Sequence, residues 1–86
     1  MNIVFTPTAW RQYTEWIHED KKVIKRINDL IKDIGRNGLL TGIGKPEPLR
    51  YRKACSRRIN DEHRLIYNID DKQNLIIYSC KYHYQD

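Results

Sequence analysis

Apolar positions in the first half of the chain repeat at helical spacing. The repeat is clearest over residues 20–34, where apolar side chains recur three or four positions apart and charged side chains fill the positions between them. The apolar members are Val23, Ile24, Ile27, Leu30, Ile31 and Ile34. Asp20 opens the segment, and Gly35 is the residue type that commonly follows a helix. The pattern predicts an amphipathic helix that ends at Gly35.

A shorter strand and helix precede this one. Residues 3–5, Ile-Val-Phe, are typical of a strand. The pair that follows, Thr-Pro, suits an N-cap and a first helical position. Trp10, Tyr13 and Trp16 then lie at helical spacing. We therefore expect a strand over residues 3–5 and a helix over residues 7–18.

The period of the pattern changes to two after residue 48, which predicts strands. Residues 37–48 hold several glycines and prolines and predict a loop. The expected strands are 55–60, 63–70 and 75–82. Alternation directs Ile59, Leu65, Tyr67 and Ile69 to the helices, and Arg58 and Arg64 to the opposite face.

This order of elements predicts an α+β fold. Two N-terminal helices would pack on one face of a small antiparallel sheet and leave the other face open. The chain has 86 residues, enough for one domain, which we take to span residues 1–86.

Positive charge is concentrated in one stretch of the chain. The formal charge is +5, and residues 44–58 hold six basic residues against Glu47 alone. Such a cluster can be a solubilising surface or a contact with a polyanion, since Lys and Arg release counterions when they bind phosphates. Four of the six are arginines, which suit bidentate phosphate contacts. If the cluster contacts a polyanion, Lys45 and Arg57 are candidate RNA-binding residues.

Other features of the sequence indicate in which cellular compartment the protein is expected. The longest apolar run is far below the ~18 residues of a membrane span, and the first residues lack the apolar run of a signal peptide. Two cysteines cannot build a disulfide framework. We expect a cytoplasmic protein with no membrane partner.

The second half of the chain carries the groups that metal-free RNA cleavage requires. That reaction needs a base for the 2′-hydroxyl, an acid for the leaving 5′-oxygen, and cations for the phosphate. Glu47, bracketed by two prolines, is the candidate base, and His83 is the candidate acid. Arg58 and Arg64 would hold the phosphate. Tyr84 could stack on a base or donate a hydrogen bond to the phosphate.

Several of these residues also have ordinary structural explanations. Arg64 could form a salt bridge across the turn that precedes it, and His63 is better explained by capping or packing than by catalysis. Sheet packing is the favoured role of four tyrosines, at positions 51, 67, 78 and 82. A zinc site can be imagined from Cys55, His63, Cys80 and His83, but their spacing matches no compact ligand motif. We expect no metal and no cofactor.

Four segments closely resemble, in order and spacing, the YoeB branch of the RelE-like bacterial toxins. They are Gly-Lys-Pro-Glu-Pro-Leu at 44–49, Ser-Arg-Arg-Ile at 56–59, Glu-His-Arg-Leu-Ile-Tyr at 62–67 and Tyr-His-Tyr at 82–84. The resemblance implies the RelE-like microbial ribonuclease fold. It also implies an endoribonuclease toxin of a type II toxin–antitoxin system, which cuts mRNA in the ribosomal A site and inhibits translation.

The resemblance also implies roles for individual residues. Glu47 matches the general base, Arg64 the arginine that stabilises the transition state, and His83 the general acid. Tyr84 matches a further catalytic partner. Two arginines, Arg50 and Arg58, match supporting phosphate contacts. The implied partners are a YefM-like antitoxin, the ribosome with its mRNA, and a second copy of the chain in a homodimer.

The chain departs from the pattern at two places, which leaves other functions open. Relatives carry Gly-x-Trp where residues 53–55 read Lys-Ala-Cys, and Gln85 and Asp86 follow the tyrosine at which related chains often stop. One alternative is a ParE-like toxin that acts on gyrase. Others are a non-catalytic module that binds nucleic acid and a degenerate toxin kept for binding its antitoxin.

Overall fold

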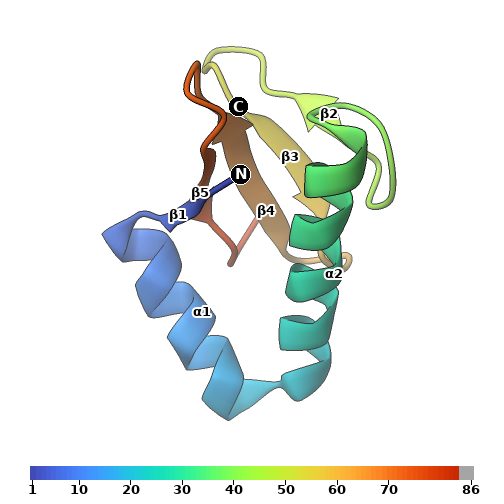
Figure 1. Ribbon diagram of the computed structural model, residues 1–86. Helices are drawn as coiled ribbons and strands as arrows, with labels where there is room; N and C mark the ends of the chain where they lie inside the picture. Colours follow the sequence, from blue (N-terminus) through green and yellow to red (C-terminus); the bar gives the residue numbers. More distant parts are fainter. Residues whose placement is uncertain (84–86) are drawn as a thin grey trace.

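The computed structural model describes residues 1–83, in which two helices lie on one face of a five-stranded sheet (Figure 1). The elements are β1 (Ile3–Phe5), α1 (Pro7–Glu19), α2 (Lys21–Asn37), β2 (Glu47–Pro48), β3 (Cys55–Arg58), β4 (Arg64–Ile69) and β5 (Leu75–Ser79). The α+β fold with two N-terminal helices on one sheet face is confirmed.

Each helix begins at the cap that the sequence predicts. The Thr6 hydroxyl accepts a hydrogen bond from the backbone N–H of Ala9, and the Asp20 carboxylate accepts one from that of Lys22. The second helix, however, does not end at Gly35. Its last turn continues to Asn37, and Gly38, with φ +88°, closes it. Because only glycine adopts that conformation without strain, Gly38 is the terminator and Gly35 is an ordinary helical residue.

The sheet is mixed, with strand order β1-β5-β4-β3-β2. The four C-terminal strands pair antiparallel, as expected, but β1 runs parallel to β5. A parallel neighbour needs a long crossover connection, and the chain between β1 and the rest of the sheet contains both helices. The final strand stops at Ser79, earlier than predicted, because the next backbone N–H, that of Cys80, donates to the Gln12 side chain of α1.

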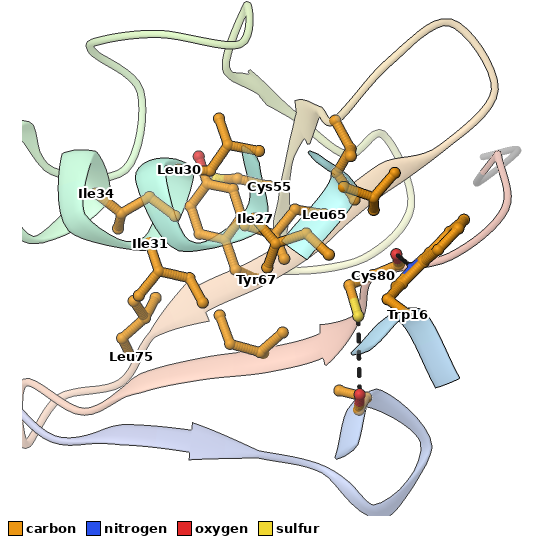
Figure 2. Close-up of a cluster of buried hydrophobic side chains, with 14 residues drawn as sticks. Trp16, Ile27, Leu30, Ile31, Ile34, Cys55, Leu65, Tyr67, Leu75 and Cys80 are labelled. Carbon is orange, nitrogen blue, oxygen red and sulfur yellow. Dashed lines mark hydrogen bonds between the residues drawn. The ribbon is translucent and has the colours of Figure 1, made fainter. Parts of the chain in front are cut away.

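One core forms between the helices and the sheet (Figure 2). The inward face of α2 packs against Leu65 and Tyr67 of β4 and against Leu75 and Ile77 of β5. The alternation predicted for β4 is therefore correct. None of the described helices has the length and apolar character needed to cross a membrane.

The prediction that Arg57 binds phosphate is wrong, because its side chain is completely buried. Arg57 lies on β3 opposite Leu65 and faces the helices. Its guanidinium donates hydrogen bonds to the Asp33 carboxylate and to the Tyr67 hydroxyl. It also donates to three backbone carbonyls of the loop after α2, those of Gly38, Thr41 and Ile43. Arg57 therefore fixes the loop that leads to β2.

The Arg57–Asp33 pair should make stability depend on pH. The hydrogen bond from Arg57, and next the backbone N–H of Ile43, hold the pKa of Asp33 below its usual value of 3.8. Since the folded-state pKa is lowered, the stabilisation is present above the usual value and is lost as pH falls through the folded pKa. We expect Asp33→Asn to lose less stability than the wild type between pH 5 and pH 2.5, measured by urea unfolding. If the free energy of unfolding fell equally steeply with pH in Asp33→Asn and in the wild type, Asp33 would not be the source of the pH dependence.

Candidate active site

The predicted acid, the predicted base and three of the predicted cations line one pocket on the sheet face that lies away from the helices. The pocket has a volume of about 190 Å³. Its walls come from the loop before β2, from β2 and β3, from the start of β4 and from the C-terminal segment. They are formed by Lys45, Glu47, Pro48, Leu49, Ser56, Arg58, Arg64 and His83. Five of the eight site residues predicted from the sequence are therefore brought together.

Sheet register explains why these side chains converge. Glu47 lies directly opposite Ser56, and Arg58 lies directly opposite Arg64. Paired residues share a face, and so do residues two apart on one strand. The four side chains therefore emerge on the same side of the sheet. Ser56 was not predicted as a site residue, although its spacing from Arg58 places it on this face.

The loop before β2 approaches β3 closely and sets the position of Glu47. The backbone N–H of Arg58 donates to the Gly44 carbonyl at 2.7 Å. Gly44 has φ +83°, and a Cβ at this position would lie 2.8 Å from Leu30 Cδ2. Lys45 also has a positive φ, of 51°. This tight turn delivers Lys45 and Glu47 to the edge of the pocket.

Arg64 is held by backbone carbonyls and not by a salt bridge. Its Nη1 donates to the carbonyls of Asn60 at 2.6 Å, Asp61 at 3.4 Å and His63 at 3.1 Å. The structure gives it no ion pair with Asp61 or Glu62 among residues 1–83, so the alternative of a hairpin salt bridge is not supported. All three bonds start at Nη1, so that no residue from 1 to 83 occupies Nε or Nη2, and both can donate to a phosphate.

The other charged groups of the pocket face solvent. Glu47, Arg58 and His83 are exposed. Within the described part of the chain, their side chains form no hydrogen bond or ion pair. Two prolines restrict the backbone on either side of Glu47. The pocket thus presents a carboxylate, an imidazole and three cations to a ligand without neutralising them internally.

Two further predicted residues are not placed in the pocket. Arg50 is outside its lining; it lies in the loop between β2 and β3 and stacks on Tyr51, with Cζ 5.8 Å from the ring centre. Tyr84 lies outside the described residues. The neighbouring Arg52 stacks on Tyr78 of β5 at 4.3 Å, which folds this loop over the open face of the sheet.

The remaining sequence alternatives have mixed outcomes. Tyr67 packs in the core as expected, but Tyr51 and Tyr82 are 77% and 64% exposed, so the packing prediction was wrong for them. Both cysteines are buried free thiols. Burial raises the pKa of Cys80 to about 12. No three His, Cys, Asp or Glu side chains in residues 1–83 gather as metal ligands would.

His63 packs and caps, as the sequence suggested. Its ring contacts Trp16 edge-on, with centroids 4.8 Å apart. Its Nδ1 accepts a hydrogen bond from the backbone N–H of Tyr82 at 2.7 Å. This bond lies next to the pocket, because Tyr82 directly precedes His83.

Comparisons with known sequences agree with one another. Residues 5–84 match the family described as the YoeB-like toxin of bacterial type II toxin–antitoxin systems. A Toxin YoeB of Synechocystis is 53% identical over 99% of both chains. The Toxin YoeB of Escherichia coli K12 is 43% identical over 98% of this chain and all of its own.

Solved structures give the same result for the fold. A YoeB dimer from Staphylococcus aureus superposes with a TM-score of 0.91, at 52% identity over 98% of both chains. A heterotetrameric YoeB–YefM complex from the same organism has a TM-score of 0.90 over the same share of each chain. A YoeB/ParE toxin from Agrobacterium tumefaciens scores 0.92 at 38% identity, over 98% of this chain and 100% of its own. The chain belongs to the YoeB-like toxins of bacterial type II toxin–antitoxin systems.

Proposed function

We propose that this toxin is a ribosome-dependent mRNA endoribonuclease that needs no metal ion. The observation that carries the proposal is the convergence of Glu47, Arg58, Arg64 and His83 on one pocket. A carboxylate, an imidazole and fixed cations around a small pocket are the groups that 2′-hydroxyl attack on a phosphodiester requires.

In the proposed reaction, the Glu47 carboxylate removes the proton of a ribose 2′-hydroxyl. The 2′-oxygen attacks the adjacent phosphorus and forms a 2′,3′-cyclic phosphate. The bond between phosphorus and the 5′-oxygen breaks, and His83 donates the proton that this oxygen takes up. Arg58, Arg64 and Lys45 stabilise the charge on the non-bridging oxygens. By the resemblance to the family, Tyr84 would act as a further catalytic residue, and Arg50 would add a supporting contact to an RNA phosphate.

Exposure of the reacting groups supports dependence on the ribosome. Glu47 and His83 have no partner among the described residues that would fix their orientation, and they face bulk water. Catalysis requires the groups to be held close to the reacting atoms. A ribosome that presents mRNA in a fixed conformation against this open pocket would hold the reacting atoms close to Glu47 and His83. The resemblance of the chain to its family supports the ribosomal A site as the proposed place of cleavage.

We also propose a YefM-like antitoxin as the partner that inhibits this chain, and a homodimer as its free form. The Staphylococcus aureus relatives form a YoeB–YefM complex and a YoeB dimer. The pocket of this chain holds three cations against one carboxylate, which suits an acidic, flexible antitoxin segment.

The test is primer extension on mRNA after induction of the toxin in cells, and on purified mRNA with and without ribosomes. We expect cut ends within translated codons, appearing in vitro only when ribosomes are present. Products should carry a cyclic or 3′-phosphate and a 5′-hydroxyl. A gyrase supercoiling assay runs in parallel. Growth arrest with intact mRNA and altered supercoiling would reject the nuclease in favour of a ParE-like target. RNA binding without cleavage would favour a non-catalytic module.

A further inference from the structure

The C-terminal segment that delivers His83 has no regular secondary structure, yet each of the three residues before His83 is anchored. Cys80 donates its backbone N–H to Gln12 at 2.7 Å. Its carbonyl accepts a hydrogen bond from Trp16 Nε1 at 2.9 Å, and Figure 2 shows these two residues side by side. Lys81 Nζ lies 3.2 Å from a Glu19 carboxylate oxygen and its side chain is only 10% exposed. These contacts tie residues 80 and 81 to α1, on the side away from β3.

Tyr82 is attached differently, and its backbone is strained. Its φ of 69° is left-handed, a conformation that costs a residue other than glycine about 1–2 kcal/mol. Its side chain is mostly exposed, and its ring makes only loose contacts, with its centre 6.1 Å from that of the His63 ring and 5.9 Å from Lys81 Nζ. Two backbone hydrogen bonds hold it: its N–H donates to His63 Nδ1 at 2.7 Å, and its carbonyl accepts from the Arg64 N–H at 3.1 Å.

One of these two bonds is made to a side chain, that of His63, and the position of this side chain is itself fixed by its neighbours. Its side chain is 14% exposed, and its ring packs edge-on against Trp16. Its backbone N–H donates to Asn60 Oδ1 at 2.8 Å. Because Nδ1 accepts a hydrogen bond, the ring proton of the neutral form is on Nε2. Glu62 lies 4.0 Å from that nitrogen.

We propose that His63 is a positioning residue, which holds Tyr82 in its left-handed conformation so that His83 projects into the pocket beside Arg64. The effect of His63 on cleavage rests on the proposed nuclease function, whereas its effect on the conformation of Tyr82 does not. The strained turn redirects the chain after Lys81, and the residue that follows it lines the pocket with Arg64. Without the His63 acceptor, Tyr82 loses one of two bonds that offset its strain and relaxes to negative φ. His83 then leaves its place, while α1 still holds residues 80 and 81.

The test uses two variants of nearly equal shape. His63→Asn keeps an acceptor oxygen at the position of Nδ1, whereas His63→Leu puts a methyl group there. Hydrogen exchange of the Tyr82 amide is measured by NMR in each, with the Cys80 amide as an internal control. We expect about tenfold faster exchange at Tyr82 in His63→Leu, the effect of one lost hydrogen bond, with Cys80 unchanged. His63→Asn should exchange like the wild type.

Single-turnover cleavage on programmed ribosomes supplies the second measurement. We expect the cleavage rate constant of His63→Leu to fall about 100-fold with unchanged half-saturation, because a small misplacement of an acid has that effect. His63→Asn should restore most of the rate. If His63→Leu does not fold, His63→Ala is measured in the same way.

The two readouts separate the possible failures. Unchanged Tyr82 exchange in His63→Leu overturns the positioning role, whatever the activity. Faster exchange with an unchanged cleavage rate also overturns it. If the wild type cleaves no RNA, the nuclease proposal fails, and the exchange data still decide whether His63 holds Tyr82.

Discussion

Replacement of Arg57 by alanine is expected to destabilise the domain by about 3–5 kcal/mol, the usual cost of removing one partner from a buried ion pair. The variant would leave the Asp33 carboxylate, the Tyr67 hydroxyl and three loop carbonyls without their donor. A domain of this size has about 5–10 kcal/mol of stability in total. The substitution should therefore remove a large share of the stability and shift the midpoint of chemical denaturation well below that of the wild type.

The neighbouring arginine is a matched control. Arg58 lies on the same strand with its side chain exposed on the opposite face. Arg58→Ala should change stability by less than about 0.5 kcal/mol, as surface substitutions usually do. It should weaken cleavage instead. If both variants proved equally stable, the buried network would not fix the loop before β2 as we infer.

Replacement of Glu47 or His83 by alanine is expected to remove toxicity without unfolding the protein. A general base or acid contributes about 100- to 10,000-fold to such a reaction. Each single variant should therefore reduce single-turnover cleavage by about that factor and relieve growth arrest on induction. The double variant should lose less than the product of the two factors, because the groups act on one transition state.

Matched controls separate this loss from general effects of charge. Asp71, in the turn between β4 and β5, is an exposed carboxylate, and His18, near the end of α1, is an exposed histidine. Neither lines the pocket. Asp71→Ala and His18→Ala should keep full toxicity, and thermal unfolding of all four variants should match the wild type. Full toxicity in both Glu47→Ala and His83→Ala would contradict the proposed mechanism.

The helix starts and the inward-facing strand residues could be predicted from the sequence, because they depend on residues that are close together in the chain. The caps at Thr6 and Asp20 are set by side chains three residues or fewer from the groups they bind. The alternation in β4 follows from the two-residue period of a strand and correctly directs Leu65 and Tyr67 inward. The same alternation also places Arg57 on the inner face. Composition favoured a phosphate contact, and alternation was the better guide.

Other features depend on partners that are distant in the sequence. The parallel pairing of β1 with β5 joins residues more than seventy positions apart. The end of β5 at Ser79 is fixed by the hydrogen bond that the next backbone N–H, that of Cys80, donates to Gln12 of α1. No window of sequence contains both members of such contacts.

The sequence by itself determined the helices, the alternation of the strands and the presence of a carboxylate, arginines and a histidine suited to one reaction. Only the tertiary structure supplied the partners that satisfy the buried Arg57 guanidinium, because the carboxylate, hydroxyl and carbonyls that it binds come from segments distant in the sequence. It also decided that His83 lies beside Arg64, because the left-handed turn at Tyr82 that directs it there is bonded to His63 and to the Arg64 backbone. Period and composition are properties of neighbouring residues, whereas a pocket is made by residues that folding brings together.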